Sequence, residues 1–499
     1  MERYLDPDRI LSGDKDENFY FFTEFRDLLV LLINTSFSNL PSPVRLDRNG
    51  RLKSTAEVFG ILKTKELHIN HVGFPGDWEG EEIIKILEHF GSIRFTQCQF
   101  YLKKIDLRSP RISFFECRFS ATHEVLNVRL RKDHSYDDCI YQNCIFDGDL
   151  HCGIDDEKER TIIQHPLFSK CTFSKNLKLR NVELEGYLFD PDQRYPTTLH
   201  SITATNCIFQ SGTYLNIKNL MDAAVFRSCI FKGKFEFKRN RIGALIINNC
   251  NFEKVADFHG SLFLRFKINK SIFSTFAGFE NCIFGQTPLE EKKATKLARA
   301  SRIVADFSYV TFLEHSSFRN AVFVTGLNIE KINTIEPPNF HNTQVSFEHT
   351  NRETFRIIKH ALDAHGSHIE ANKYFALEMK KFQKELSTNF WDSLIYKING
   401  LTSDFGQSYL RATSCIIILS ITFSLLSLGQ ENNILYKIYP PANDIIRFIS
   451  SLFNGFASGF LPFKQFLRTD MEFISLIFYI MFGILIWQTI IAVKRLIKR

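Results

Sequence analysis

Eight of the 11 cysteines in this chain stand in the same three-residue unit, Cys-x-Phe, which recurs through the middle of the sequence. A short unit repeated many times predicts a solenoid, because a single coil cannot bury its apolar side alone and must stack on its neighbours. In an extended backbone the first and third residues point to the same side, so we expect thiol and ring to face the interior together. The residues of this structural ladder are Cys98, Phe100, Cys117, Phe119, Cys144, Phe146, Cys171, Phe173, Cys207, Phe209, Cys229, Phe231, Cys250, Phe252, Cys282 and Phe284.

The spacing of the units sets the expected size of one coil. The units at Cys207, Cys229 and Cys250 and the variant Ser271-Ile-Phe273 follow one another at nearly equal intervals. Earlier intervals are longer, and the longest of them runs from Cys171 to Cys207, which predicts loops or insertions between coils. Phenylalanine supplies 51 of the 499 residues, against 15 tyrosines and 3 tryptophans, as expected if its ring stacks coil upon coil.

This pattern resembles the pentapeptide-repeat proteins, whose coils carry a small residue and a Phe or Leu at successive corners. The resemblance extends over residues 91–345 and includes the stretches Val225–Phe231 and Ala277–Phe284. It implies a bacterial protein with a right-handed parallel β-helix. The fold class we predict is therefore mainly β, a right-handed parallel β-helix solenoid followed by a helical hairpin and two transmembrane helices.

The cysteines have two other interpretations, as metal ligands or as disulfides. The chain has no Cys-x-x-Cys pair, the close spacing typical of zinc sites, and 11 is an odd number. The amino terminus, Met1-Glu2-Arg3 followed by charged sequence, does not read as a secretory signal. We therefore expect free, buried thiols in a reducing compartment, with no metal and no cofactor.

Two apolar stretches near the carboxyl end predict membrane-spanning helices. They are residues 412–429 and 473–493, and neither stretch includes a charged side chain. Both are long enough to cross a bilayer; the alternative, helices buried in a soluble core, fits poorly with charge placed only at their ends. Basic residues flank the pair, which predicts that both ends and the amino-terminal body lie on the cytoplasmic side of an inner membrane.

The segment between these stretches predicts more than a plain loop. After Pro440-Pro441, residues 444–453 place Ile445, Phe448, Ile449 and Leu452 on one helical face. A half-helix followed by a glycine-containing stretch is the arrangement of a re-entrant pore loop, although the potassium filter sequence is absent. The alternative is an amphipathic helix lying on the membrane surface. The candidate pore-loop residues are Asn454, Gly455, Ser458, Gly459 and Pro462.

The repeats and the two apolar stretches divide the chain into four expected regions. Residues 352–386 predict a helical hairpin with Gly366 at its turn. The hairpin and the stretch Ser403–Arg411 also resemble the connector of bacterial pentapeptide-repeat proteins that carry a membrane segment at the carboxyl end. The regions are an N-terminal cap region (1–90), the β-helix (91–345), a helical hairpin connector (346–400) and a two-span membrane domain (401–499).

The sequence offers no catalytic signature. It contains no phosphate-binding loop, no dinucleotide fingerprint, no zinc-protease motif and no serine-hydrolase motif, so we expect no enzyme. A net charge of +7 is small for 499 residues and does not indicate nucleic acid as a partner. The expected partners are membrane lipid and a protein bound on the long β-helix surface.

Two functional classes remain. In the first, a cytoplasmic solenoid senses or binds a partner, and the two-span tail forms an ion-conducting or membrane-perturbing homo-oligomer, a role in bacterial defence being one possibility. In the second, the tail only tethers a protein-binding scaffold to the inner membrane. A simple tether needs one span, whereas this chain has two spans and a glycine-broken segment, which favours the effector.

Overall fold

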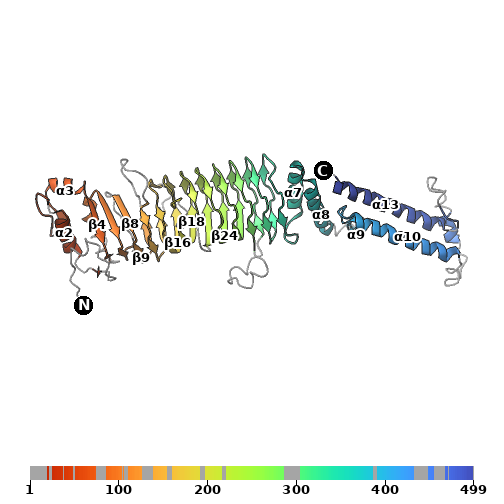
Figure 1. Cartoon of the computed structure of the whole chain (residues 1–499), viewed down its shortest axis with the longest axis horizontal. Helices are drawn as coiled ribbons and strands as arrows, with labels where there is room; N and C mark the ends of the chain where they lie inside the picture. The colour runs from red at the N-terminus through yellow and green to blue at the C-terminus, as the bar shows by residue number, and fades with distance from the viewer. Residues whose placement is uncertain are drawn as a thin grey trace. The chain divides into compact units, whose positions relative to one another are not determined.

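The computed structural model describes residues 20–21, 25–37, 39–48, 51–74, 86–103, 105, 111–125, 139–153, 160–191, 197–215, 221–285, 304–385, 390–431, 448–454, 467–469 and 471–497. The chain divides into two compact units, Met1–Thr350 and Asn351–Arg499 (Figure 1). The first is a parallel β-solenoid of about 10 turns, and the second is helical. The predicted fold class, a parallel β-solenoid followed by helices, is confirmed.

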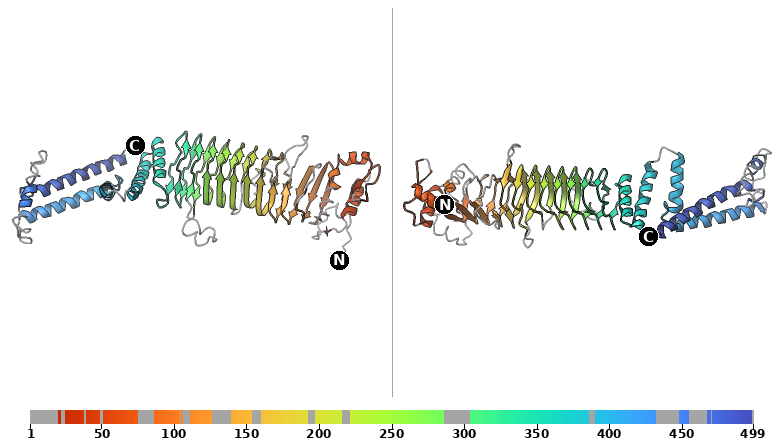
Figure 2. Two further views of the ribbon diagram at one scale, coloured as in Figure 1. Left: turned by 180° about the vertical axis from the view of Figure 1, so that it is seen from behind. Right: turned by 90° about the horizontal axis from the view of Figure 1, so that it is seen from above.

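The regular part of the solenoid has four-sided coils. In one coil β24 (Arg241–Asn248) supplies two sides, while β25 (Asn251–Phe252) and β26 (Ala256–Asp257) supply one side each. The parallel ladder of β24 skips Gly243, which separates its two sides. The next coil repeats the arrangement, so that Phe252 pairs with Phe273. Figures 1 and 2 show these short strands stacked coil upon coil.

The strands assemble into four parallel sheets along the solenoid. The largest has 17 strands and covers two sides of the regular coils. Its members are β1 (Tyr20–Phe21), β5 (Val72–Phe74), β7 (Gln99–Phe100), β9 (Arg118–Phe119), β10 (His123–Val125), β12 (Ile145–Phe146), β13 (Leu150–Cys152), β16 (Thr172–Arg180), β18 (Thr198–Thr205), β21 (Met221–Arg227), β24, β27 (Leu262–Asn269), β30 (Ile283–Phe284), β31 (Ala305–Asp306), β34 (Val322–Phe323), β35 (Leu327–Asn328) and β37 (Gln344–Val345).

Two further sheets lie on the other sides of the regular coils. The 8-stranded sheet contains β14 (Thr161–Ile163), β17 (Val182–Leu184), β19 (Ile208–Phe209), β22 (Ile230–Phe231), β25, β28 (Ile272–Phe273), β32 (Thr311–Phe312) and β36 (Asn333–Thr334). A 5-stranded sheet contains β20 (Thr213–Tyr214), β23 (Phe235–Glu236), β26, β29 (Ala277–Gly278) and β33 (Ser316–Ser317).

The parallel ladder begins before residue 91, the start expected from the sequence. The other 5-stranded sheet already contains a strand at residues 66–70, which pairs with the strand at 92–96 over its whole length. The sequence pattern did not predict this earlier coil, because the coil contains no Cys-x-Phe unit. Its strands are β4 (Glu66–Asn70), β6 (Ser92–Thr96), β8 (Arg111–Phe115), β11 (Tyr141–Gln142) and β15 (Phe168–Ser169).

Short helices precede these coils in the cap region. In α2 (Phe25–Ser36), Leu29 and Ile33 are buried, so this apolar run packs in the core of the unit. The remaining cap elements are the antiparallel pair β2 (Arg45–Leu46) and β3 (Leu52–Lys53), α3 (Ala56–Leu62) and the single-turn η1 (Leu87–His89).

The second unit opens with the predicted helical hairpin. Helices α7 (Arg352–Ala364) and α8 (His368–Glu385) pack together, and Gly366 makes the turn with φ +75°. The side chain of Asn351 accepts a hydrogen bond of 2.8 Å from Thr354 N–H and so caps α7. A third helix, α9 (Phe390–Ser403), runs across the boundary that we expected at residue 400.

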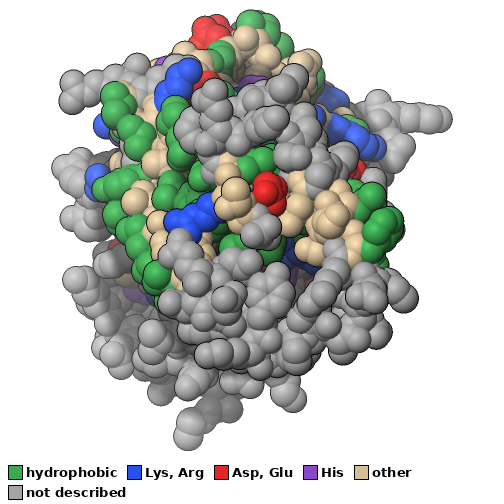
Figure 3. Space-filling model, turned by 90° about the vertical axis from the view of Figure 1, so that its right-hand side faces the viewer, with side chains coloured by type: hydrophobic (Ala, Val, Ile, Leu, Met, Phe, Trp, Pro, Cys, Tyr) green, Lys and Arg blue, Asp and Glu red, His purple; other side chains and the backbone are tan. Residues whose placement is uncertain are grey.

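Two long apolar helices complete the unit. They are α10 (Tyr409–Glu431) and α13 (Glu472–Ile497), and each is long and apolar enough to cross a membrane. They lie side by side and run antiparallel, with Phe423 against Phe478 at a ring separation of 5.0 Å (Figures 1 and 2). Hydrophobic side chains cover much of the described surface in the end view of Figure 3. Residues 448–454 are also helical, which overlaps the predicted amphipathic segment 444–453 and includes Asn454, the first of the candidate pore-loop residues.

Candidate functional site

All of the Cys-x-Phe residues lie in the solenoid interior, but they form two columns rather than one. Cys98, Cys117, Cys144, Cys171 and Cys282 immediately precede strands of the 17-stranded sheet, with each side chain almost fully buried. The other three precede strands of the 8-stranded sheet, where the variant Ser271 continues their column. These three are Cys207, Cys229 and Cys250.

The two columns explain the long interval between Cys171 and Cys207, which we had attributed to a loop or insertion. Along the first column the residue that follows Cys171 is Thr197, which precedes β18 as Cys171 precedes β16. Cys207 lies further along the same coil, at the corner before the 8-stranded sheet. The interval therefore exceeds one coil because the motif changes corner.

Phenylalanine rings form continuous stacks behind each column. In the 8-stranded sheet the ring of Phe252 lies 4.7 Å from that of Phe231 and 4.6 Å from that of Phe273. In the first column the stack from Phe100 to Phe173 has separations of 5.0, 4.8 and 4.9 Å. These near-parallel rings supply the packing between successive coils.

The corner before each cysteine has a left-handed backbone. The preceding residue has φ between 51° and 56° in every one of the eight units. The thiol then lies near carbonyl oxygens: Cys117 Sγ is 3.4 Å from Phe115 O and 3.5 Å from Phe95 O of the coil before. Ser271 makes the same contact with Asn269 O at 2.9 Å. The thiols thus act as small polar groups that bind corner carbonyls, besides filling space.

Burial keeps these thiols away from reaction partners. Loss of solvent raises the pKa of the Cys117 and Cys171 thiols, and it raises the pKa of Cys282 to about 12. Hydrogen bonding with Cys229 lowers the pKa of Cys207 and Cys250, and in Cys144 the rise in pKa due to burial is outweighed by hydrogen bonds with neighbouring groups. A thiolate must be reached by its partner to attack or to bind metal, and all of these side chains are almost fully buried. All 11 cysteines are free, and only Cys415 is partly accessible. The columns are therefore structural rather than reactive.

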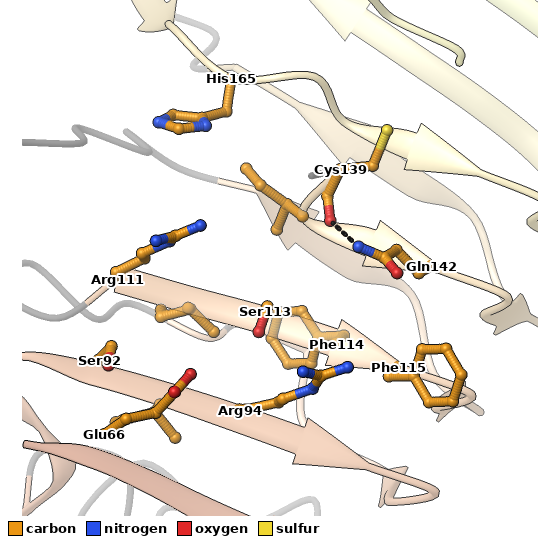
Figure 4. Close-up of a pocket in the computed structure, with 13 residues that line it drawn as sticks. Glu66, Ser92, Arg94, Arg111, Ser113, Phe114, Phe115, Cys139, Gln142 and His165 are labelled. Atoms are coloured by element: carbon orange, nitrogen blue, oxygen red, sulfur yellow. Dashed lines mark hydrogen bonds between the residues drawn. The ribbon is translucent and has the colours of Figure 1, made fainter. Parts of the chain in front are cut away.

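A polar pocket of about 270 Å³ opens on the outer face of the first coils (Figure 4). Strand alternation turns Leu67, Ile93 and other apolar residues inward and leaves the polar residues outside. In the register of the parallel strands β6 and β8, Ser92 lies opposite Arg111 and Arg94 lies opposite Ser113. In Figure 4, His165 and Cys139 border one side and Glu66 and Arg94 the other.

Charge in this pocket is mixed. The Arg94 guanidinium lies 5.6 Å from the Phe115 ring centroid, and Arg111 makes no ion pair with any residue that the structure describes. Glu66 lies 3.5 Å from His68 on its own strand. The pocket therefore places guanidinium and hydroxyl donors beside one carboxylate. No motif in the sequence indicated this pocket, because its residues are brought together only by the stacking of coils.

A polar junction joins four helices of the second unit. Three consecutive residues between α9 and α10 have left-handed backbone: Asp404, Phe405 and Gly406, with φ of 50°, 57° and 78°. For a bulky residue such as Phe405 this conformation costs roughly 1–2 kcal/mol. The junction consists of Asn372, Lys380, Ser403, Asp404, Gln407, Gln488 and Arg495.

Hydrogen bonds and ion pairs hold this strained turn. Ser403 Oγ donates to Gln488 Oε1 at 2.8 Å and accepts from Gly406 N–H at 3.0 Å. Asp404 pairs with Lys380 of α8 at 2.9 Å. Arg495 of α13 donates to the carbonyl oxygen of Phe405. Because its members come from α8, α9, α13 and the turn that leads into α10, the junction connects the hairpin to both apolar helices.

The candidate pore-loop residues fall mostly outside the described part of the chain. Gly455, Ser458, Gly459 and Pro462 lie outside the described residues. Asn454 is described, and its side-chain oxygen accepts a hydrogen bond of 3.1 Å from Phe473 N–H in the first turn of α13. Asn454 thus supplies a capping contact to the second apolar helix, a role that its sequence context did not reveal.

Helix α10 carries a row of exposed hydroxyl groups that sequence analysis passed over. Thr413, Ser420 and Ser424 are seven and four residues apart, which places them along one side of the helix. All three side chains are exposed, whereas Leu419 and Phe423 are half-buried and Phe423 packs against α13. The spacing was visible in the sequence, but which side of α10 faces α13 was not.

No known protein family, no curated protein and no solved structure matches this chain at a significant level.

Proposed function

We propose that this chain is a membrane-anchored β-solenoid of the pentapeptide-repeat type, whose apolar helix pair assembles with copies of itself into an ion-conducting or membrane-perturbing effector. In this proposal α10 and α13 cross the bilayer, the solenoid and both ends lie on the cytoplasmic side, and a protein partner binds the solenoid surface. The four-sided coils support the repeat type, since their two-residue strands bring a Phe ring inward coil after coil.

The hydroxyl row on α10 is the observation that carries the effector proposal. Thr413, Ser420 and Ser424 are exposed along one side of a helix that has no charged side chain from residue 412 to 429, and the exposed Ser414 and Thr422 lie on other sides. In a bilayer, small hydroxyl residues favour close contact between helices, and in an assembly they line a polar path. A lone pair of helices leaves this row facing lipid, whereas a homo-oligomer gives it a partner.

The polar junction supports coupling between the solenoid side of the chain and the helix pair. A turn held in left-handed conformation by the surrounding helices stores strain that a different arrangement of those helices releases. A partner bound to the solenoid, for instance at the pocket around Arg94 and Arg111, is then the stimulus in this proposal.

A passive tether is the second candidate, and one observation favours it. The hydroxyl of Thr413 donates to Tyr409 O at 2.9 Å, and that of Thr422 donates to Ile418 O at 2.8 Å. Hydroxyl groups bonded to their own helix tolerate a lipid environment without any other partner. In that case the solenoid alone performs the function, as a binding scaffold at the membrane.

Cross-linking between copies distinguishes the two candidates. In a Cys415→Ala background, the full chain with Ser424→Cys is reconstituted in lipid vesicles and treated with a mild oxidant. The effector proposal expects a disulfide-linked dimer at Ser424 and much less dimer for the control Leu425→Cys, which points to a different side of α10. Equal, weak cross-linking at both positions would leave the passive tether as the better account.

A further inference from the structure

Helix α9 has two chemically different sides. On one side Tyr396 packs against Phe382 of α8 at a ring separation of 5.1 Å, and Ser403 belongs to the polar junction. The other side is exposed and carries large apolar residues at intervals of three and four, so that they share one broad face. The residues of this apolar face are Phe390, Trp391, Leu394, Ile395, Ile398 and Leu401.

The side chains of the apolar face are far more exposed than those that pack inside the unit. Trp391 and Leu401, near its two ends, are 71% and 76% exposed. Charged residues of the same helix, Asp392 and Lys397, stand at the two edges of the face rather than in it. An apolar face bounded by charge, with an aromatic pair in its first turn, is typical of helices that lie at a membrane surface.

The direction of α9 agrees with that interpretation. The left-handed turn at Asp404–Gly406 redirects the chain between α9 and the start of α10 at Tyr409. The right-hand view in Figure 2 shows α9 running across the direction of α10 and α13. A helix that crosses the end of a membrane-spanning pair lies in the plane of the bilayer surface.

We propose that α9 is a membrane-surface helix whose apolar face inserts into the boundary between lipid headgroups and acyl chains. This inference rests on the proposed membrane crossing of α10 and α13, with which α9 is continuous in sequence and joined through the polar junction. Lipid is the occupant we assign because the carboxyl end of the face, at Leu401, lies two residues before Ser403, which contacts α13 and leads through the turn into α10. Lys397 and Arg411 are exposed basic side chains that suit anionic headgroups, and Arg411 also lies 3.9 Å from Asp404.

Tryptophan positions make the proposal and its premise separately testable. The chain has 3 tryptophans, and the exposed Trp391 and Trp487 lie on α9 and in the interior of α13. Two full-length variants keep one of them each: Trp78→Phe with Trp487→Phe, and Trp78→Phe with Trp391→Phe. Both are reconstituted in phosphatidylcholine–phosphatidylglycerol vesicles whose acyl chains carry bromine either close to the headgroup or close to the bilayer centre.

The expected result is a difference in depth between the two reporters. Trp391 fluorescence should be quenched more by the shallow bromines, giving a shallow-to-deep ratio above one, whereas Trp487, one residue before the junction residue Gln488, should be quenched by both lipids with a lower ratio. The additional change Ile395→Glu should lower Trp391 quenching several-fold, and the conservative control Ile395→Val should leave it unchanged. Thermal unfolding of the solenoid followed by circular dichroism should be the same in all variants.

Each other outcome contradicts a defined part of the account. Quenching of Trp487 with no quenching of Trp391 by either lipid overturns the surface helix and leaves the membrane crossing intact. Strong Trp391 quenching by the deep bromines overturns it too, because α9 would then be inserted across the bilayer. A blue-shifted but unquenched Trp391 would mean that a second copy, not lipid, covers the face. Absence of Trp487 quenching removes the premise itself.

Discussion

The hydroxyl of Ser403 donates a hydrogen bond of 2.8 Å to the side-chain oxygen of Gln488, a residue 85 positions later. Ser403 is the last residue of α9 and is fully buried, and Gln488 lies inside α13. The same hydroxyl oxygen accepts the N–H of Gly406, so one side chain holds both the strained turn and the contact between helices. The beginning of one apolar helix is thereby fastened to the end of the other.

Replacing that hydroxyl should weaken the helical unit. Ser403→Ala leaves the Gly406 N–H and the Gln488 side chain without this partner, which we expect to cost about 1–3 kcal/mol. Trp487 fluorescence during thermal unfolding of the full chain in detergent measures the loss. The neighbouring Thr402→Ala is the control, because among the described residues the Thr402 hydroxyl bonds only Ile398 O of its own helix, and equal effects of both changes would contradict the role of the junction.

Removing a stacked ring should destabilise the solenoid strongly. Phe252 lies between two rings at 4.7 and 4.6 Å and is fully buried, so Phe252→Ala should cost roughly 3–5 kcal/mol. Circular dichroism of the full chain during heating checks this. Ile272→Ala, at the exposed middle position of the adjoining unit, should change the midpoint little. A midpoint unaffected by Phe252→Ala would mean that the stack does not hold the coils together.

Serine should be tolerated in place of a cysteine whose thiol contacts a corner carbonyl, and it should destabilise the fold where the thiol has no such contact. Cys229 Sγ lies 3.3 Å from Arg227 O, so Cys229→Ser should keep the fold with a change of at most about 1 kcal/mol. Cys152 is equally buried but contacts no such acceptor among the described residues, so Cys152→Ser should cost more, about 1–3 kcal/mol. Chemical denaturation curves test the contrast, and equal losses at both positions would show that the thiols act by size alone.

Acid should weaken the solenoid through His123. Complete burial lowers the pKa of its imidazole from 6.5 to about 3, so the folded protein stays neutral where the unfolded chain takes up a proton. The contribution of His123 to the free energy of unfolding is fully present above the unfolded pKa and is lost as the pH falls toward about 3. The loss amounts to about 2 kcal/mol at roughly pH 5.

The variant His123→Gln isolates this contribution. Glutamine does not titrate in this range and can still bond the Tyr141 hydroxyl, which lies 3.1 Å from His123 Nε2. Melting midpoints of the full chain, compared between neutral and mildly acidic buffer, should fall less in the variant than in the parent. An identical fall in both proteins would assign the acid sensitivity to other groups.

The repeat itself predicted most of the solenoid, because each Cys-x-Phe unit satisfies the alternation of an extended strand whatever its neighbours do. The spacing did not reveal that Cys171 and Cys207 stand at different corners, since a long interval is equally compatible with an insertion. The pocket around Arg94 and Arg111 depends on the register between β6 and β8, which no single segment specifies.

The helical unit was predicted less completely for a different reason. Residues 412–429 and 473–493 have no charged side chain on any side, so they were found by length and the absence of charge alone. Helix α9 exposes most of its large apolar residues on one face, and the sequence alone does not show that this face is exposed while Tyr396, on the other side, packs against α8. The left-handed turn at Phe405 also had no local signal, because the surrounding helices impose it.

Conductance of the full chain in planar lipid bilayers tests the effector proposal most directly. We predict discrete current steps for the parent protein and their loss in the double variant Ser420→Leu with Ser424→Leu, which removes two of the three exposed hydroxyls of the row while leaving the helix apolar enough to insert. Quenching of Trp487 by brominated lipid verifies insertion of both proteins. An inserted parent protein that gives no current above the bare bilayer would contradict the effector and leave a tethered scaffold.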